Sequence, residues 1–193
     1  WKNNETLFIT DVVSSPNSSR TTLDAAEVFR FKAENETDEV LKKEYLQKAI
    51  SYSEKSMKIN PNYATTYISL GFAHYDQFNY DKTAELFLQG YNLDTTSADS
   101  KKCLIILSAI FYKQGNGLWE DGNIEGAIRK YLKAVELNSD NVEAWYNLGG
   151  NYYFIKDTIN ALKAWDKVKS LDPDHLLKKE DFLNIIIANP NPG

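Results

Sequence analysis

The sequence contains one cysteine, Cys103, and two histidines, His74 and His175, which lie far apart in the chain. A single cysteine excludes an intrachain disulfide, and no set of histidines and cysteines has the spacing of a zinc site. The sequence also lacks the glycine-rich phosphate loops, the nucleophile elbow and the H-E-x-x-H metal motif. We therefore expect no catalytic residues, no metal and no cofactor, and we expect that the chain is not an enzyme.

Positive charge and long apolar runs are also scarce. The 22 lysines and arginines against 27 aspartates and glutamates give a net charge of −5. This balance argues against a nucleic-acid partner, because such surfaces are basic. The apolar stretch Leu104–Ile110 is interrupted by Ser108 and is far shorter than the roughly 18–20 residues that cross a bilayer. We therefore expect no nucleic-acid binding and no membrane insertion by this segment.

A recurring pattern of large and small residues dominates what the sequence does contain. Its most complete copy consists of Trp145, Leu148, Gly149, Tyr152, Ala161, Trp165 and Pro173. The first four positions fall on one face of a helix, and a second helix supplies the small Ala161 and the large Trp165. Earlier copies of the same packing positions are Tyr67, Leu70, Gly71 and Phe87, and Ala127 with Tyr131.

This pattern resembles that of the tetratricopeptide-repeat (TPR) family, W-x₂-L-G-x₂-Y…A-x₃-F…P. The resemblance implies an all-α solenoid of helical hairpins, wound as a right-handed superhelix. Repeat ends fall at Pro16, Pro61, Thr95, Ser139 and Pro173. Two of the intervals equal the TPR period of about 34 residues, and the other two are about ten residues longer.

The two longer intervals indicate insertions. We place the first at Glu34–Tyr45, a charged segment that favours a helix, since about eleven residues make close to three turns. The second lies within Ala98–Asn123, for which we expect a long helix that ends irregularly, with Gly115 and Gly117 in a loop.

We therefore predict a single domain, 1–193, with the following parts. They are a half repeat at 1–16, repeats at 17–61, 62–95, 96–139 and 140–174, a capping helix at 175–188, and a tail at 189–193. His74 should be a packing residue, His175 should lie on the surface at a helix start, and Cys103 should be buried among apolar neighbours.

In TPR proteins the first helices of successive repeats line a concave groove that holds a protein or a peptide. The stripe beside the packing positions consists of Ile68, Phe72, Tyr75, Tyr146, Asn147, Gly150 and Tyr153. It is aromatic with few charges. The family's clamp for a terminal carboxylate uses lysine and asparagine, and only Asn147 fits it. We expect a non-catalytic scaffold that binds a protein or peptide in this groove, although packing between repeats also explains part of the stripe.

The opening segment, from Trp1 to Leu7-Phe8 and then Ser15-Pro16-Asn17-Ser18, carries a second resemblance. It is similar to the junction after the last membrane helix in the transmembrane-and-TPR family of O-mannosyltransferases. This implies an alternative: the extracytoplasmic C-terminal TPR domain of a multi-pass membrane glycosyltransferase-like protein. The location is then extracytoplasmic, such as a bacterial periplasm, and otherwise cytoplasmic.

Overall fold

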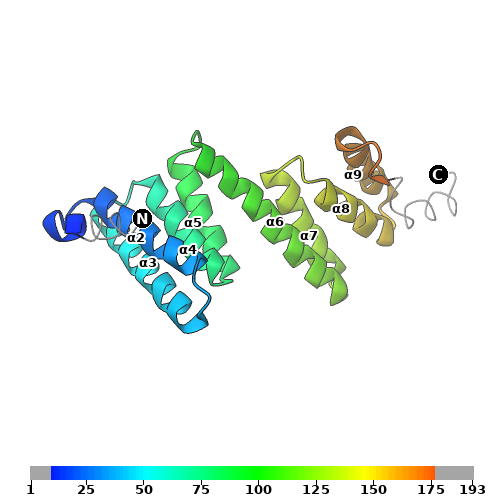
Figure 1. Cartoon of the computed structure of the whole chain (residues 1–193). Coiled ribbons are helices and arrows are strands. Elements are labelled where there is room, and N and C mark those ends of the chain that lie inside the picture. The colour runs from blue at the N-terminus through cyan, green and yellow to red at the C-terminus, as the bar shows by residue number, and fades with distance from the viewer. Residues whose placement is uncertain (1–9, 177–193) are drawn as a thin grey trace. The chain divides into compact units, whose positions relative to one another are not determined.

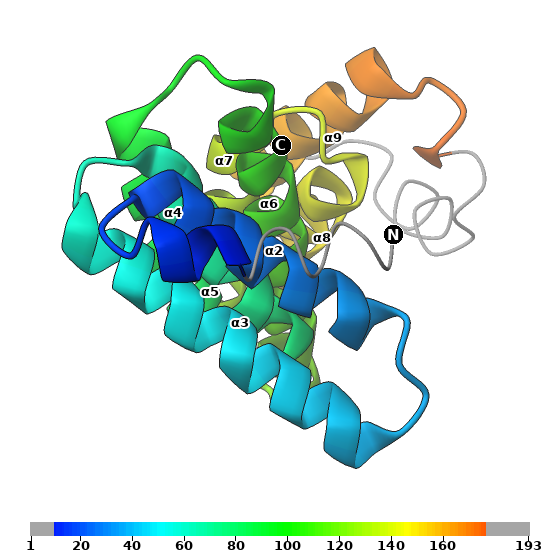
Figure 2. The same ribbon diagram turned by 60° about the vertical axis from the view of Figure 1, so that its left-hand side comes forward.

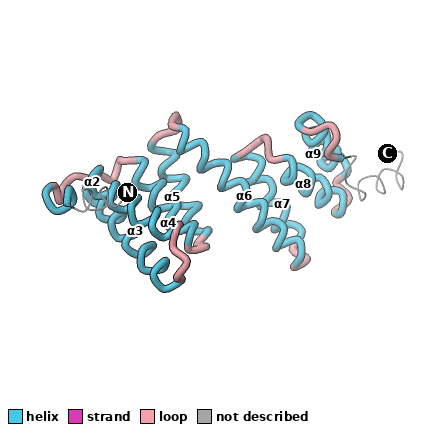
Figure 3. The backbone as a smooth tube through the Cα atoms, viewed as in Figure 1, coloured by secondary structure: helices cyan, strands magenta, loops and turns pink. Residues whose placement is uncertain are grey.

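The computed structural model describes residues 10–176 as helices joined by short loops, without strands in that range (Figures 1 and 3). The helices are α2 (Ser19–Glu34), α3 (Glu39–Ile59), α4 (Ala64–Asp76), α5 (Tyr80–Leu93), α6 (Ala98–Glu120), α7 (Ile124–Leu137), α8 (Val142–Phe154) and α9 (Thr158–Leu171). The prediction of an all-α chain of TPR-type helical hairpins is confirmed. Part of the predicted TPR junction at the N-terminus, most of the half repeat, most of the capping helix and the whole tail lie outside the described residues.

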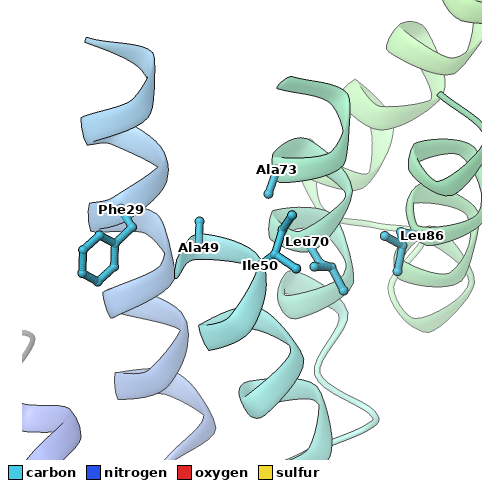
Figure 4. Close-up of a cluster of buried hydrophobic side chains, with 6 residues drawn as sticks. All are labelled: Phe29, Ala49, Ile50, Leu70, Ala73 and Leu86. Atoms are coloured by element: carbon cyan, nitrogen blue, oxygen red, sulfur yellow. The ribbon is translucent and has the colours of Figure 1, made fainter. Parts of the chain in front are cut away.

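The chain divides into two compact units, one up to Leu104 and the other from Ile105, with the boundary inside α6. In the first unit α2 packs against α3, α4 against α5, and α3 against α4 (Figure 2). A buried cluster joins all four helices (Figure 4): Phe29, Ala49, Ile50, Leu70, Ala73 and Leu86. In the second unit α7 packs against α8, and α8 against α9.

Three hairpins, α4–α5, α6–α7 and α8–α9, bring a glycine of the first helix against an aromatic ring of the second. A Cβ on Gly71 would lie 2.5 Å from the ring of Phe87, and a Cβ on Gly115 would lie 2.6 Å from the ring of Tyr131. A Cβ on Gly149 would lie 2.6 Å from Cδ1 of Trp165. Atoms cannot approach this closely, so only glycine lets the two helices reach their observed separation. This contact outweighs the cost of about 1 kcal/mol for a glycine in a helix.

The same turn connects the two helices of three hairpins. In the turn after α4, the amide of Phe78 donates to the carbonyl of Tyr75 (2.9 Å) and that of Asn79 donates to His74 (3.0 Å). The residue in the left-handed conformation is Phe78 (φ 60°), and its counterparts are Gly122 and Lys156. This is the Schellman ending of a helix.

The residue after each left-handed position then begins the following helix. Asn79, Asn123 and Asp157 are the N-caps of α5, α7 and α9, and their side-chain oxygens accept from backbone amides three residues on. Each of these turns is therefore only three residues long, because the residue whose amide closes the Schellman motif also caps the next helix.

Two helices are longer than the rest. α3 has 21 residues and α6 has 23, whereas α4, α5, α7, α8 and α9 have 13 or 14. The expectation that Gly115 and Gly117 form a loop is wrong, since α6 continues to Glu120. Packing of Gly115 against Tyr131 holds that part of the chain helical. The division of the chain into repeats stays a prediction.

The described C-terminal part packs against α8 and α9. Leu176 lies in a buried cluster with Ala161, Trp165 and Val168. His175 is only 9% exposed, and its ring lies edge-on to Tyr146 at 5.6 Å between centroids. The expectation of a surface histidine is therefore wrong, because the chain after α9 returns to the surface of the last hairpin. Cys103 is fully buried, as predicted.

Candidate functional site

The repeat-packing positions occupy the interiors of the hairpins or their edges. Those with less than a tenth of their surface exposed are Leu70, Gly71, Phe87, Ala127, Tyr131, Leu148, Gly149, Ala161 and Trp165. Tyr67, Trp145 and Tyr152 are half-buried, and Pro173 is exposed. Tyr67 donates its hydroxyl hydrogen to the carbonyl of Pro61 (2.8 Å), and Nε1 of Trp145 donates to that of Ser139 (2.9 Å). These residues hold the helices together and present little surface to a ligand.

A hydrogen-bond network connects α6, α7 and α8 in the second unit. The buried Tyr131 hydroxyl donates to Oδ1 of Asn116 at 2.8 Å. Nδ2 of Asn147 donates to the same oxygen at 2.9 Å. Burial is also the main cause that raises the pKa of Tyr131 to about 12, so its hydroxyl keeps its proton at neutral pH. Tyr131 therefore fixes the Asn116 side chain from the core, and Asn116 fixes Asn147.

This network uses only half of the hydrogen-bonding capacity of the two carboxamides. Within the described part of the chain, Nδ2 of Asn116 and Oδ1 of Asn147 form no hydrogen bond, and both residues are half-buried. An asparagine side chain can donate two hydrogen bonds and accept two. The pair thus offers a partner one fixed donor and one fixed acceptor.

An aromatic pair lies further along the same two helices. The rings of Trp119 and Phe154 meet edge to face at 5.4 Å between centroids, and these side chains are 40% and 63% exposed. Helical spacing places Trp119 on the same side of α6 as Asn116, and Phe154 on the same side of α8 as Asn147. Between the last two lies Gly150, where a Cβ would meet no atom within 4 Å. We call Asn116, Trp119, Asn147, Gly150 and Phe154 the α6–α8 face.

Tyr146 and Tyr153, which the sequence assigned to the groove, are half-buried on the adjacent stripe of α8. Both pack against the cluster of Trp165 and Leu176. The ring of Tyr153 lies 5.9 Å from that of Trp165, and Tyr146 contacts His175. These rings therefore contribute mainly to the packing of the last hairpin.

In the first unit the sequence-predicted groove residues differ in exposure. Ile68 is only 5% exposed and lies against Gly90 of α5. It therefore belongs to the core and offers no surface to a ligand. Phe72 packs edge-on against Phe87 at 4.9 Å between centroids. Tyr75 is 36% exposed and contacts the ring of Tyr80.

A charged residue of α2 lies over Phe72, in contrast to the expected scarcity of charge. The Arg30 guanidinium lies over the Phe72 ring at 5.3 Å and pairs with Asp76 of α4 at 3.8 Å. It also pairs with Glu27 at 3.3 Å, whose carboxylate accepts from the Ser69 hydroxyl. Burial raises the pKa of Asp76, and Arg30 opposes that shift. In this cluster one guanidinium pairs with two carboxylates, so the charged groups bind one another, in contrast to the half-used carboxamides of the α6–α8 face.

Sequence reasoning missed Asn116 and Trp119. The signal for them in the sequence is Gly115. It precedes Tyr131 by sixteen residues, and the same spacing separates Gly71 from Phe87 and Gly149 from Trp165. With Gly115 in that role, Asn116 follows it by one residue and Trp119 by four. Asn147 belongs to the predicted stripe, whereas Phe154 does not.

Two further features concern residues 10–176. No helix there is both long and apolar enough to cross a membrane. No group of three or more histidine, cysteine, aspartate or glutamate side chains there could hold a metal ion.

Comparison with known proteins identifies repeats in part of the chain. Models described as TPR repeat and tetratricopeptide repeat match residues 115–154 and 142–175. The chain is similar to human protein O-mannosyl-transferase TMTC1, with 31% identity over 80 residues, 42% of this chain and 9% of that protein. Human TMTC3 is 25% identical over 146 residues, 75% of this chain and 15% of that protein. The crystal structure of MamA aligns with a TM-score of 0.49 at 18% identity, covering 86% of this chain and 85% of that one.

The chain thus spans only about a tenth of the length of the first of these relatives. Both family models fall in the second unit, where they include the end of α6, the helices α7, α8 and α9, and the contacts of Gly115 with Tyr131 and of Gly149 with Trp165. Residues 115–175 therefore carry tetratricopeptide repeats.

Proposed function

We propose that this chain is a non-catalytic scaffold that binds a segment of another protein on the α6–α8 face. The single observation that carries the proposal is the half-used carboxamide pair, Asn116 and Asn147, next to an exposed aromatic pair. A buried tyrosine hydroxyl holds the first of these carboxamides in place. Fixed polar groups of this kind orient a ligand, and exposed aromatic rings supply apolar contact area.

The lack of charge on the α6–α8 face has a consequence for binding. None of its five residues is charged, so the affinity for a partner should depend only weakly on ionic strength. Because Tyr131 fixes the carboxamides before binding, little side-chain entropy is lost on association.

The test uses the whole chain and a library of random twelve-residue peptides displayed on phage. Peptides selected on the wild-type chain are synthesised, and their affinities are measured by fluorescence anisotropy. Gly150→Met fills the open space between Asn147 and Phe154 and should weaken binding at least tenfold. Gly117→Met is the matched control, since a Cβ at Gly117 also meets no atom within 4 Å. Gly117 lies outside the α6–α8 face, because it is rotated by about 100° around the helix from Asn116.

The two variants should have equal helix content, and Gly117→Met should bind like the wild type. Failure to select any peptide, or equal binding by both variants, contradicts the proposal.

A second candidate function has its own support. We infer from the similarity to TMTC1 and TMTC3 that this chain forms the extracytoplasmic TPR domain of a membrane-bound glycosyltransferase-like protein. On this reading the domain binds a segment of an acceptor protein or of a partner, and the chemistry lies elsewhere in the protein. The test is the full-length protein in its own cells: it should resist carbonate extraction from membranes, and the TPR residues should be protected from protease until the membrane is opened. Release by carbonate contradicts this candidate.

A further inference from the structure

The α6–α8 face also indicates what kind of segment it recognises. Resting on the proposed function above, we propose that the bound segment is extended. We further propose that it carries a large uncharged apolar side chain two residues away from the backbone amide held by Asn116 and Asn147.

The extended form follows from the two open positions of the carboxamide pair. Nδ2 of Asn116 can donate to a carbonyl, and Oδ1 of Asn147 can accept from an amide. A peptide backbone offers one carbonyl and one amide per residue. In a helix these groups are used internally, whereas in an extended segment they are free for a partner. The carboxamide pair is therefore complementary to an extended backbone.

The spacing of two residues follows from the positions of the two pairs along their helices. From Asn116 to Trp119 the rise along α6 is about 4.5 Å, and from Asn147 to Phe154 along α8 it is about 10.5 Å. The midpoints of the two pairs are thus about 7–8 Å apart. An extended chain rises about 3.2–3.4 Å per residue, so this distance corresponds to two residues.

The apolar character follows from the aromatic pair. Phe154 is 63% exposed and Trp119 is 40% exposed, and the neighbouring Ile155 is 46% exposed. A large apolar side chain would cover this surface and remove it from water. Gly150 leaves room for the partner's backbone to pass between the pairs. In the first unit, by contrast, the ring of Phe72 already has two cations of the chain itself over it, Arg30 and Lys102.

The experiment starts from a peptide selected on the wild-type chain. Each backbone amide in turn is replaced by its N-methyl form, which cannot donate, and each side chain in turn is replaced by serine. One N-methylation and one serine replacement, two residues apart, should each lower the affinity at least tenfold. Replacing the apolar residue by lysine or aspartate should lower it at least as much as serine.

Two variants of the protein assign these effects to the two pairs. Phe154→Ala should abolish the preference for the apolar residue over serine, while the effect of N-methylation remains. Asn116→Asp retains an acceptor for Tyr131 and Asn147 but removes the donor, so it should weaken every peptide and leave the apolar preference intact.

The possible failures are distinguishable. A peptide that binds in a manner sensitive to Gly150→Met, but prefers lysine or arginine at the critical position, overturns this inference and leaves the proposed function standing. The same holds if the two critical residues are not two apart, or if the bound peptide is helical by circular dichroism. Absence of any peptide binding overturns both, as does binding of a mannose oligosaccharide that depends on Phe154 in place of a peptide.

Discussion

Two adjacent glycines of α8 allow a sharp test of how the helices of a hairpin pack. Gly149→Ala and Gly150→Ala gain the same helix propensity, about 1 kcal/mol each. At Gly149 the added Cβ would lie 2.6 Å from Cδ1 of Trp165, whereas at Gly150 it would meet nothing within 4 Å. Overpacking of this kind costs about 1–3 kcal/mol. The free energy of unfolding should therefore rise by about 1 kcal/mol in Gly150→Ala and lie about 1–3 kcal/mol lower in Gly149→Ala than in Gly150→Ala.

The measurement is urea unfolding followed by far-ultraviolet circular dichroism, with linear extrapolation to water. A double-mutant cycle with Trp165→Leu assigns the cost to this ring: in that background the difference between the two alanine variants should shrink, with a coupling of about 0.5–3 kcal/mol. If both alanine variants stabilise the chain equally, the close contact between α8 and α9 does not exist and the reasoning fails.

Three further predictions concern single residues. Tyr131→Phe removes the hydroxyl that holds Asn116 and should lower the free energy of unfolding by about 1 kcal/mol in a urea titration; no loss would show that this hydroxyl bonds to water. Cys103 is buried, which raises its pKa to about 12, so iodoacetamide should modify it only in urea, as measured by mass spectrometry; fast labelling of the folded chain contradicts its burial. Burial lowers the pKa of His74 below the ordinary 6.5, so below that pH the unfolded chain binds a proton that the folded chain does not, and stability falls. His74→Tyr should reduce this loss between about pH 7.5 and about pH 5, measured by urea midpoints; an unchanged loss would assign it to other groups.

The hairpin architecture could be predicted because it depends on local spacing. Gly149 and Trp165 stand in a nearly complete repeat pattern, so their contact follows from the sequence. Gly115 has the same role, but Gly117 and Gly122 follow closely, and three glycines in eight residues favour a loop by propensity. Tertiary packing against Tyr131 overrides that propensity. Single-residue preferences carry no information about this contact between helices.

The candidate site was only partly predictable for a related reason. Helical spacing shows which residues share a side of α8, but it does not show what covers each side. Tyr146 and Tyr153 appear as ligand-binding rings in the sequence, yet the chain beyond α9 returns and places His175 and Leu176 against them. The α6–α8 face depends on contacts between helices that are about thirty residues apart in sequence, as between Asn116 and Asn147.

The turns that connect the helix pairs also bear on how the chain folds. Asn79, Asn123 and Asp157 each cap a helix immediately after the preceding helix ends, so the two helices of a pair meet without the closure of a long loop. Contacts between neighbours in sequence form quickly, because little chain entropy is lost before they are made. During synthesis each pair can therefore assemble from residues that have just left the ribosome and offer its apolar side to the pair that follows.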